Sequence, residues 1–321
     1  MSSSPVSVTR AAIDTAAERL GNRVRQTPIL TIDGSQLDLP GTVTLKLEHL
    51  QHSGTFKARG ATHYLLANQV GPVGVAAASG GNHGAAVAWA ARELGHPATI
   101  FVPTISAPAK VDRLRSYGAD VIQTGAVYAE SLAACEAHQA ATGATGVHAY
   151  EAMDVVAGAG TTGREFEAQV AAAGLPPLDT VVVACGGGGL VGGIAAWFGS
   201  GTPAIACETT TTAAFAEARA AGRPVDVEVS GIAADALGAS RIGTLAFAAL
   251  TAADARSAVV GDDAVVEAQH VLWDRFRIVV EPSAAVPIAA LRSGAWTPDP
   301  DAHTGVVICG ANTAPGSLDG P

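Results

Sequence analysis

Short apolar runs recur along the chain, and most of them are followed by a glycine-containing or polar turn. In the first part of the chain, the runs with the length of a strand are residues 43–48, 73–78, 98–102 and 119–123. The stretches with the apolar spacing of a helix are residues 85–94 and 108–117. Strands and helices that alternate at this distance are typical of βαβ units, so the pattern predicts a parallel sheet.

A second series of the same kind follows later in the chain. Its predicted strands are residues 180–185, 204–208 and 305–309, and its predicted helix is residues 190–198. Residues 297–301 are rich in Pro and Asp and predict a surface loop. Because two α/β series are present, we expect two open-sheet α/β domains with a cleft between them.

Composition and charge exclude several classes of protein. The chain has 321 residues, of which 48% are apolar, and this length favours about two domains. We find no apolar run long enough to span a bilayer, and the Ser-rich start (residues 1–10) lacks the apolar core of a secretory signal. The formal net charge of −10, without a basic stripe, argues against a nucleic-acid partner.

The cysteines indicate a reducing compartment. None of the four forms a C-x-x-C pair, and none has the spacing of a zinc site. Reduced thiols in a cytoplasmic protein are the simplest interpretation. The four residues are Cys135, Cys185, Cys207 and Cys309.

Four consecutive glycines, Gly186, Gly187, Gly188 and Gly189, separate a predicted strand from a predicted helix. They leave backbone N–H groups accessible, and the helix that follows adds its positive end, so the segment suits a phosphate group. A flexible turn is the alternative. The segment lacks the GK[ST] ending of a Walker A motif, and only Glu208 offers the acidic residue of a dinucleotide site, which leaves a nicotinamide-dependent oxidoreductase as a weak alternative.

Two further motifs carry candidate chemistry. Residues 53–60 (SGTFKARG) set Lys57 among Gly, Thr and Phe, where loss of solvent would lower the amine pKa and favour a Schiff base with an aldehyde cofactor. Taken alone, Lys57 also fits a surface turn. Residues 79–84 (SGGNHG) open a predicted helix and suit a carboxylate, although a plain helix cap, made by Ser79 or Asn82, is the alternative.

Together these motifs resemble those of a known family. S-G-T-F-K-A-R-G-A, S-G-G-N-H-G and G-G-G-G-L occur in this order and are followed by V-V-E-P-S-A (279–284) and V-V-I-C-G-A-N-T (306–313). The set is similar to the fold-type II enzymes that use pyridoxal 5′-phosphate (PLP), specifically the serine/threonine dehydratase and serine racemase group. The resemblance covers about residues 20–314. It implies the tryptophan synthase β-like architecture, with a large domain of residues 1–73 and 151–321, a small domain of residues 74–150 and the cofactor in the cleft.

The resemblance also implies a role for each matching residue. Lys57 would form the Schiff base with PLP and later act as the base at the substrate Cα. Phe56 would flank the cofactor ring, Asn82 would bond its 3′-oxygen, and Cys309 would face its pyridine nitrogen. A thiol at that nitrogen leaves the ring nearly neutral, which favours rapid loss of a β-leaving group. The four glycines of residues 186–189 would hold the phosphate.

The substrate carboxylate would lie against residues Ser79, Gly80, Gly81, Asn82 and His83. Alternatives stay open for three side chains: His83 as a capping or packing residue, Cys309 as a small buried apolar residue, and Glu281 as a structural residue, although relatives place it near the cofactor.

Three positions depart from the family pattern. Gly80 occupies the place where racemases of the group carry a Ser, the acid or base on the face opposite the lysine. Glu208 matches one ligand of the divalent-metal site of some relatives, but Thr209 to Ala214 supply no second carboxylate, so we expect no metal site. The sequence ends soon after Asn312, so we expect no C-terminal regulatory domain and no feedback by isoleucine.

The sequence therefore predicts a cytoplasmic PLP-dependent lyase that dehydrates and deaminates L-serine or L-threonine. Its expected partners are a small amino-acid substrate and a second copy in a homodimer. The alternatives are β-elimination or racemisation on another β-hydroxy amino acid, such as 3-hydroxyaspartate or a β-aryl serine, and a non-catalytic PLP-binding protein. The sequence does not determine which β-hydroxy amino acid or stereoisomer is used.

Overall fold

The computed structural model describes residues 7–313. The first six and the last eight residues, which include much of the Ser-rich start and the end of the predicted large domain, lie outside the described residues. No helix in the described range is long and apolar enough to cross a membrane.

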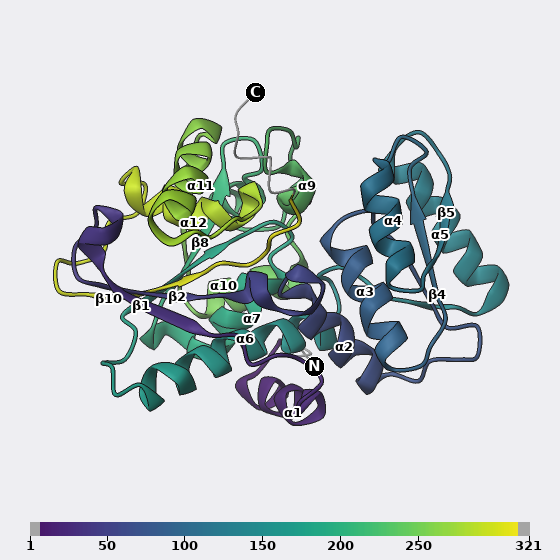
Figure 1. Cartoon of the computed structure of the whole chain (residues 1–321), viewed down its shortest axis with the longest axis horizontal. Helices are drawn as coiled ribbons and strands as arrows, with labels where there is room; N and C mark the ends of the chain where they lie inside the picture. The colour runs from purple at the N-terminus through teal and green to yellow at the C-terminus, as the bar shows by residue number, and fades with distance from the viewer. Residues whose placement is uncertain (1–6, 314–321) are drawn as a thin grey trace.

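The larger of two sheets, here called the large sheet, has six strands (Figure 1). β1 pairs with β2 in the antiparallel direction, and the other neighbours are parallel. In spatial order the strands are β1 (Ile29–Asp33), β2 (Thr42–Lys46), β10 (His303–Val307), β7 (Thr180–Ala184), β8 (Ala204–Thr209) and β9 (Arg256–Val260).

The small sheet has four parallel strands. In spatial order they are β5 (Asp120–Gln123), β4 (Ala98–Val102), β3 (Val75–Ala78) and β6 (Thr145–Gly146). Side chains of β3 point alternately to the two faces, so Val75 and Ala77 join one apolar cluster while Ala76 and Ala78 join another. A strand with two covered faces reads as a continuous apolar run, which is why the sequence pattern identified it.

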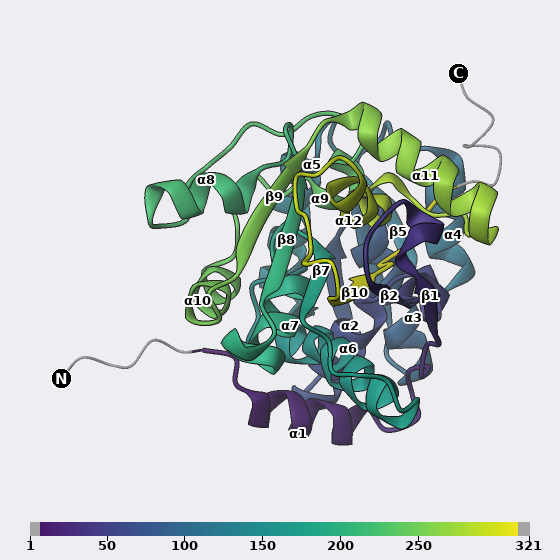
Figure 2. The same ribbon diagram turned by 90° about the vertical axis from the view of Figure 1, so that its left-hand side faces the viewer.

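Helices cover both sheets. The helices are α1 (Arg10–Leu20), α2 (Lys57–Ala67), α3 (Asn82–Glu93), α4 (Pro108–Ser116), α5 (Tyr128–Thr142), α6 (Met153–Ala172), α7 (Gly189–Phe198), α8 (Ala214–Ala221), α9 (Ala234–Leu237), α10 (Thr244–Ala252), α11 (Asp262–Phe276) and α12 (Pro282–Arg292). α11 and α12 lie over one face of the large sheet and α6, α7 and α10 over the other, with α1 beneath α6 in both views (Figure 1; Figure 2). α2 contacts both α6 and α3, so it joins the two halves of the molecule.

The predicted α/β class with two sheets is confirmed. Residues 98–102 form β4 with the predicted bounds, whereas the last strand begins and ends two residues earlier than predicted, at His303 and Val307. His303 is polar but fully hydrogen-bonded: its ring contacts Thr44 Oγ1 and the Pro176 carbonyl, and its N–H donates to Asp179. A buried strand can begin at a polar residue when every polar group has a partner. The domain boundaries at residues 74 and 150 stay a prediction.

Candidate active site

Lys57 is the first residue of α2, and the loop in front of it is held firmly. Ser53 has a left-handed backbone (φ 56°), which is uncommon for a residue other than glycine. Thr55 forms an isolated bridge with Gly310, and the N–H of Phe56 donates to the Cys309 carbonyl at 3.1 Å. The loop is therefore docked on the chain that leaves β10, and this contact determines where Lys57 lies.

A buried ionic network anchors the same helix from below. The Arg59 guanidinium donates to both oxygens of Glu48, at 2.8 and 2.7 Å, and to Glu165. Lys46 donates to Glu165 as well, and to Gln169 Oε1 at 2.7 Å. Because the charges are paired and hydrogen-bonded, they can be buried without a large penalty. The network joins α2 to β2 and α6.

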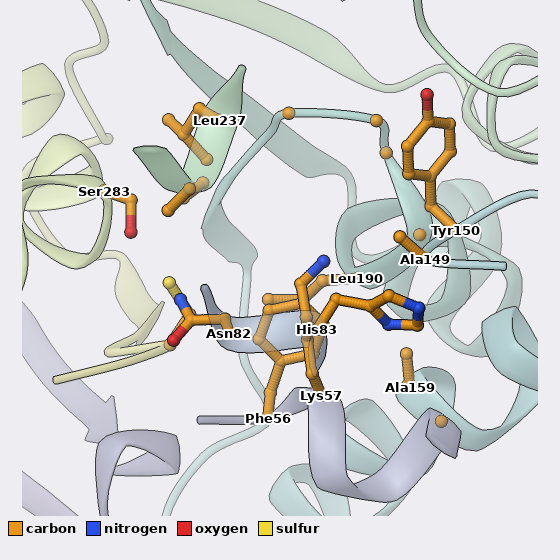
Figure 3. A pocket seen from close by; sticks show the side chains of 18 of the residues that line it. Phe56, Lys57, Asn82, His83, Ala149, Tyr150, Ala159, Leu190, Leu237 and Ser283 are labelled. Carbon is orange, nitrogen blue, oxygen red and sulfur yellow. The ribbon is translucent and has the colours of Figure 1, made fainter. Parts of the chain in front are cut away.

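A cavity of about 680 Å³, counted to its mouth, is lined by residues from both halves of the molecule. Lys57 and Asn82 lie within it, and Figure 3 shows the Lys57 side chain with Asn82 on one side and the His83 ring on the other. The predicted site residues that line the cavity are Phe56, Lys57, Asn82, His83, Gly186, Gly187, Gly188, Gly189 and Cys309. The fold thus brings together motifs that lie as far apart as residues 56 and 309.

Three predicted substrate-binding residues, Ser79, Gly80 and Gly81, are not among those that line the cavity. A Cβ atom on Gly80 would point toward Val102 and Ser106, at 3.6 and 3.7 Å. These residues lie in the segment between β3 and α3, on the small sheet's side of the cleft. Their proposed role therefore stays a prediction.

Lys57 is one of only three lysines in the chain, and the other two have carboxylate partners. Loss of solvent lowers the pKa of the Lys57 ammonium to about 8, against the opposing attraction of Glu281. No carboxylate lies within ion-pair distance of Lys57 in residues 7–313. The amine is thus a nucleophile or base at mildly alkaline pH.

The glycine loop, residues 186–189, leads directly into α7. The N–H groups of Gly186, Gly187 and Gly188 donate to no other group within the described part of the chain. Gly188 has φ +86°, and a Cβ atom on Gly187 would lie 2.4 Å from the Tyr150 ring, so neither position accepts a larger residue without strain. Free N–H groups beside a helix start form a site for a phosphate.

Asn82 is held by Glu281 from across the cleft. Its Nδ2 lies 2.7 and 3.0 Å from the two Glu281 oxygens, while its Oδ1 is buried and has no hydrogen-bond partner among the described residues. Glu281 also accepts from Ser283 Oγ and from the Asn312 N–H. Burial raises the pKa of Glu281. An unpartnered amide oxygen in a cavity wall is a binding group in search of a ligand.

His83 and Cys309 are both neutral groups of the wall. His83 Nε2 contacts the Val147 carbonyl at 2.8 Å, which requires a proton on that nitrogen. Burial, together with the nearby Lys57 charge, lowers the pKa of His83 to about 3, so its ring stays uncharged near neutral pH. Burial also raises the pKa of the Cys309 thiol, which therefore stays protonated.

Comparison with known proteins decides what this cavity holds. The model of the family described as "pyridoxal-phosphate dependent enzyme" matches residues 21–310. The chain belongs to this family. It is therefore a PLP-dependent enzyme, and its fold is that of the fold-type II group.

Several named relatives cover nearly all of this PLP enzyme. It is 33% identical to an L-threonine ammonia-lyase of Geobacter sulfurreducens over 94% of this chain and 74% of the relative. It is 30% identical to a serine racemase of Oryza sativa subsp. indica (96% and 91%) and 34% identical to a phenylserine dehydratase of Ralstonia pickettii (94% and 93%). The enzyme thus falls among threonine or serine ammonia-lyases and racemases.

Solved structures show the same likeness. Maize serine racemase superposes with a TM-score of 0.90 at 28% identity, over 98% of this chain and 96% of that one. A bacterial-type threonine deaminase, from the source abbreviated T.th., superposes with a TM-score of 0.88 at 31% identity, over 95% and 99%.

The cavity of this PLP enzyme suits the cofactor in three independent respects. It has a desolvated lysine, a glycine loop with free N–H groups and an amide oxygen without a partner. Sequence reasoning did not commit Glu281, Ser283 or Tyr150 to the site, although they line the cavity. The motif V-V-E-P-S contained a signal for Glu281, because it sets an acidic residue between a buried valine and a proline. Nothing in the sequence around Tyr150 indicated that its ring contacts Gly187.

Glu208 has a different task from the metal ligand that it matches in some relatives. Its two oxygens accept from the N–H groups of Phe215, at 2.6 Å, and Ala216, at 2.8 Å, where α8 begins. No group of three or more His, Cys, Asp or Glu side chains in residues 7–313 is arranged to hold a metal ion.

Proposed function

We propose that this PLP enzyme is a lyase that dehydrates and deaminates L-serine or L-threonine to a 2-oxo acid and ammonia. The observation that carries the proposal is Lys57, a lysine with a pKa lowered to about 8, in a cavity with the glycine loop and Asn82. Bound PLP supplies an electron sink that acidifies the α-hydrogen of an amino acid.

Each proposed role uses a property of this chain's own residues. Lys57 holds the cofactor and takes the proton from the substrate Cα, which its lowered pKa favours near pH 8. The glycine loop binds the phosphate through its N–H groups, and Phe56 contacts the ring. Asn82 binds the 3′-oxygen of the cofactor.

Cys309 is proposed to face the pyridine nitrogen as a neutral thiol, because burial keeps it protonated. A neutral partner gives no charge that would stabilise a long-lived carbanion, so loss of a β-hydroxyl is favoured over reprotonation. Residues 79–83 are proposed to bind the substrate carboxylate.

Two observations make elimination the preferred reaction over racemisation. Racemisation requires a proton donor on each face of the reacting carbon. Gly80 has no side chain to supply one, and His83 is neutral with its Nε2 proton given to Val147. The 34% identity to a phenylserine dehydratase supports a second candidate, the same elimination on a β-aryl serine.

A substrate screen of the purified holoenzyme tests the proposal. Release of 2-oxo acid and ammonia is measured for L-serine, L-threonine, 3-hydroxyaspartate and phenylserine, with Lys57→Ala as the control. We expect pyruvate or 2-oxobutyrate from the first two substrates and none from the control. Release from phenylserine alone supports the second candidate. PLP-bound enzyme that releases no 2-oxo acid from any of the four contradicts both.

A further inference from the structure

Arg113 is a cation that reaches across the cleft without meeting a carboxylate. It belongs to α4, which lies on the side of the small sheet that faces α9 (Figure 1). Its guanidinium donates to Asn312 Oδ1 and to the Ser53 carbonyl, both on the large sheet's side of the cleft. Within residues 7–313 Arg113 forms no ion pair, whereas Arg115, two residues further along, faces Asp112 at 3.6 Å.

The charge of Arg113 is not neutralised by its two contacts. A guanidinium stays protonated in proteins and has five N–H donors, of which these two neutral oxygens engage only part. The remaining donors are available to a planar anion, which a guanidinium binds in two-point geometry. Arg113 is partly buried, so solvent screens its charge less than that of a surface arginine.

Two neighbouring groups point to an absent ligand. Ser53 is 6% exposed, and its hydroxyl is buried and has no hydrogen-bond partner among the described residues. Ser53 also has the left-handed backbone described above, and strain of this kind gathers at functional sites. An unpaired buried hydroxyl beside an unpaired cation is costly unless something binds there.

The position next to Arg113 is also adjacent to the proposed substrate site. A Cβ atom on Gly81 would lie 3.9 Å from Asn312 Nδ2, and one on Gly54 would lie 3.4 Å from the Arg113 guanidinium. The N–H of Asn312 donates to Glu281, which holds Asn82. Arg113 is thus connected through Asn312 to the wall that carries Lys57.

We propose that Arg113, together with the Ser53 hydroxyl and the Asn312 amide, forms a subsite for a carboxylate of the amino-acid substrate. The inference rests on the proposed function, because it assumes that an amino acid enters this cleft. The carboxylate is either the α-carboxylate or a second one at the β-position, and the experiment separates the two. Positive charge on this wall gives an acidic protein, with a net charge of −10, a local attraction for an anionic substrate.

The test measures binding of three non-eliminating ligands to the holoenzyme by the change in its visible spectrum. L-alaninol has no carboxylate, L-alanine has one and L-aspartate has two. In Arg113→Gln, a lost charge-assisted bond should weaken binding by about 10- to 100-fold. Weaker alanine and aspartate with unchanged alaninol assigns Arg113 to the α-carboxylate. Weaker aspartate alone assigns it to a β-carboxylate and thereby to an acidic substrate.

Control variants separate binding from structure. Arg115→Gln removes a nearby arginine from the same helix and should leave all three affinities unchanged. Ser53→Ala deletes a hydroxyl that has no partner in the free protein, so it should fold normally and weaken carboxylate binding by about 2- to 10-fold. If Arg113→Gln leaves the three affinities unchanged, or weakens them equally, Arg113 is only a bridge between the two halves and the subsite is wrong. A wild-type holoenzyme whose spectrum responds to none of the ligands, and which releases no 2-oxo acid in the screen, removes the proposed function itself and the subsite with it.

Discussion

Lys57 is the lysine on which the proposed chemistry depends, and the chain offers only two others for comparison. Lys46 is committed to Glu165 and Lys110 to Asp235. We expect Lys57→Ala to abolish the visible absorbance of the purified protein, because no other lysine lines the cavity. Borohydride reduction followed by peptide mapping is the measurement. A pyridoxyl label on Lys46 or Lys110 instead of Lys57 would refute the assignment.

The lowered pKa of Lys57 predicts how cofactor uptake depends on pH. Only the neutral amine attacks an aldehyde, and a pKa of about 8 makes the neutral form dominant above that pH. The rate at which apoenzyme takes up PLP should therefore rise about tenfold between pH 7 and pH 9 and then level off. Stopped-flow absorbance measures it, with N-acetyl-lysine as the control amine. A rate for the protein that keeps rising in parallel with the control to pH 10 shows that Lys57 is not desolvated.

Gly80 and His83 together predict that elimination far exceeds racemisation. Gly80 has no titratable group, and His83 has a pKa lowered to about 3. We expect L-serine to yield pyruvate with little D-serine, which chiral chromatography and a pyruvate assay detect in one tube. D-serine formed at a rate comparable to pyruvate overturns this expectation. Gly80→Ser tests the geometry: its side chain would start toward Ser106, so any gain in racemisation requires the segment between β3 and α3 to move.

Helix α8 has no capping side chain of its own, because Ala213 precedes it. Glu208, at the end of β8, supplies the acceptors through its contacts with Phe215 and Ala216. Its carboxylate is therefore occupied within the protein, and the residues that follow it contribute no second acid. We expect EDTA or added Mg²⁺ to change activity by less than about twofold. A large loss in EDTA that Mg²⁺ restores would show that a metal site exists after all.

Across the whole molecule, two kinds of ion pair should differ widely in their effect on stability. Arg59 is fully buried with Glu48 and Glu165, so Arg59→Met leaves carboxylates unpaired in the interior and should lower the free energy of unfolding by about 3–5 kcal/mol. Lys110 and Asp235 cross the cleft but are both well exposed, so Lys110→Ala should lower it by less than about 1 kcal/mol. Denaturant unfolding of the two holoenzymes gives the comparison. Similar midpoints for both variants would mean that α2 is not anchored through Arg59.

Elements whose apolar residues are consecutive were predicted well. Residues 98–102 show why: the strand is covered on both sides, so every position is apolar or small and the run ends where the strand ends. The last strand was predicted two residues late, because His303 and Thr304 look like loop residues until their buried surroundings are known.

The sequence alone determined the class of fold, the glycine loop and Lys57, because each depends on residues that are neighbours in the chain. The tertiary structure decided which of the motif residues meet. It placed Asn82 against Glu281 and Arg113 against Asn312, pairs that lie 199 positions apart in each case, and it left Ser79, Gly80 and Gly81 outside the cavity wall. Contacts at that separation follow from how the two sheets are packed on α2, and no local pattern of residues records that packing.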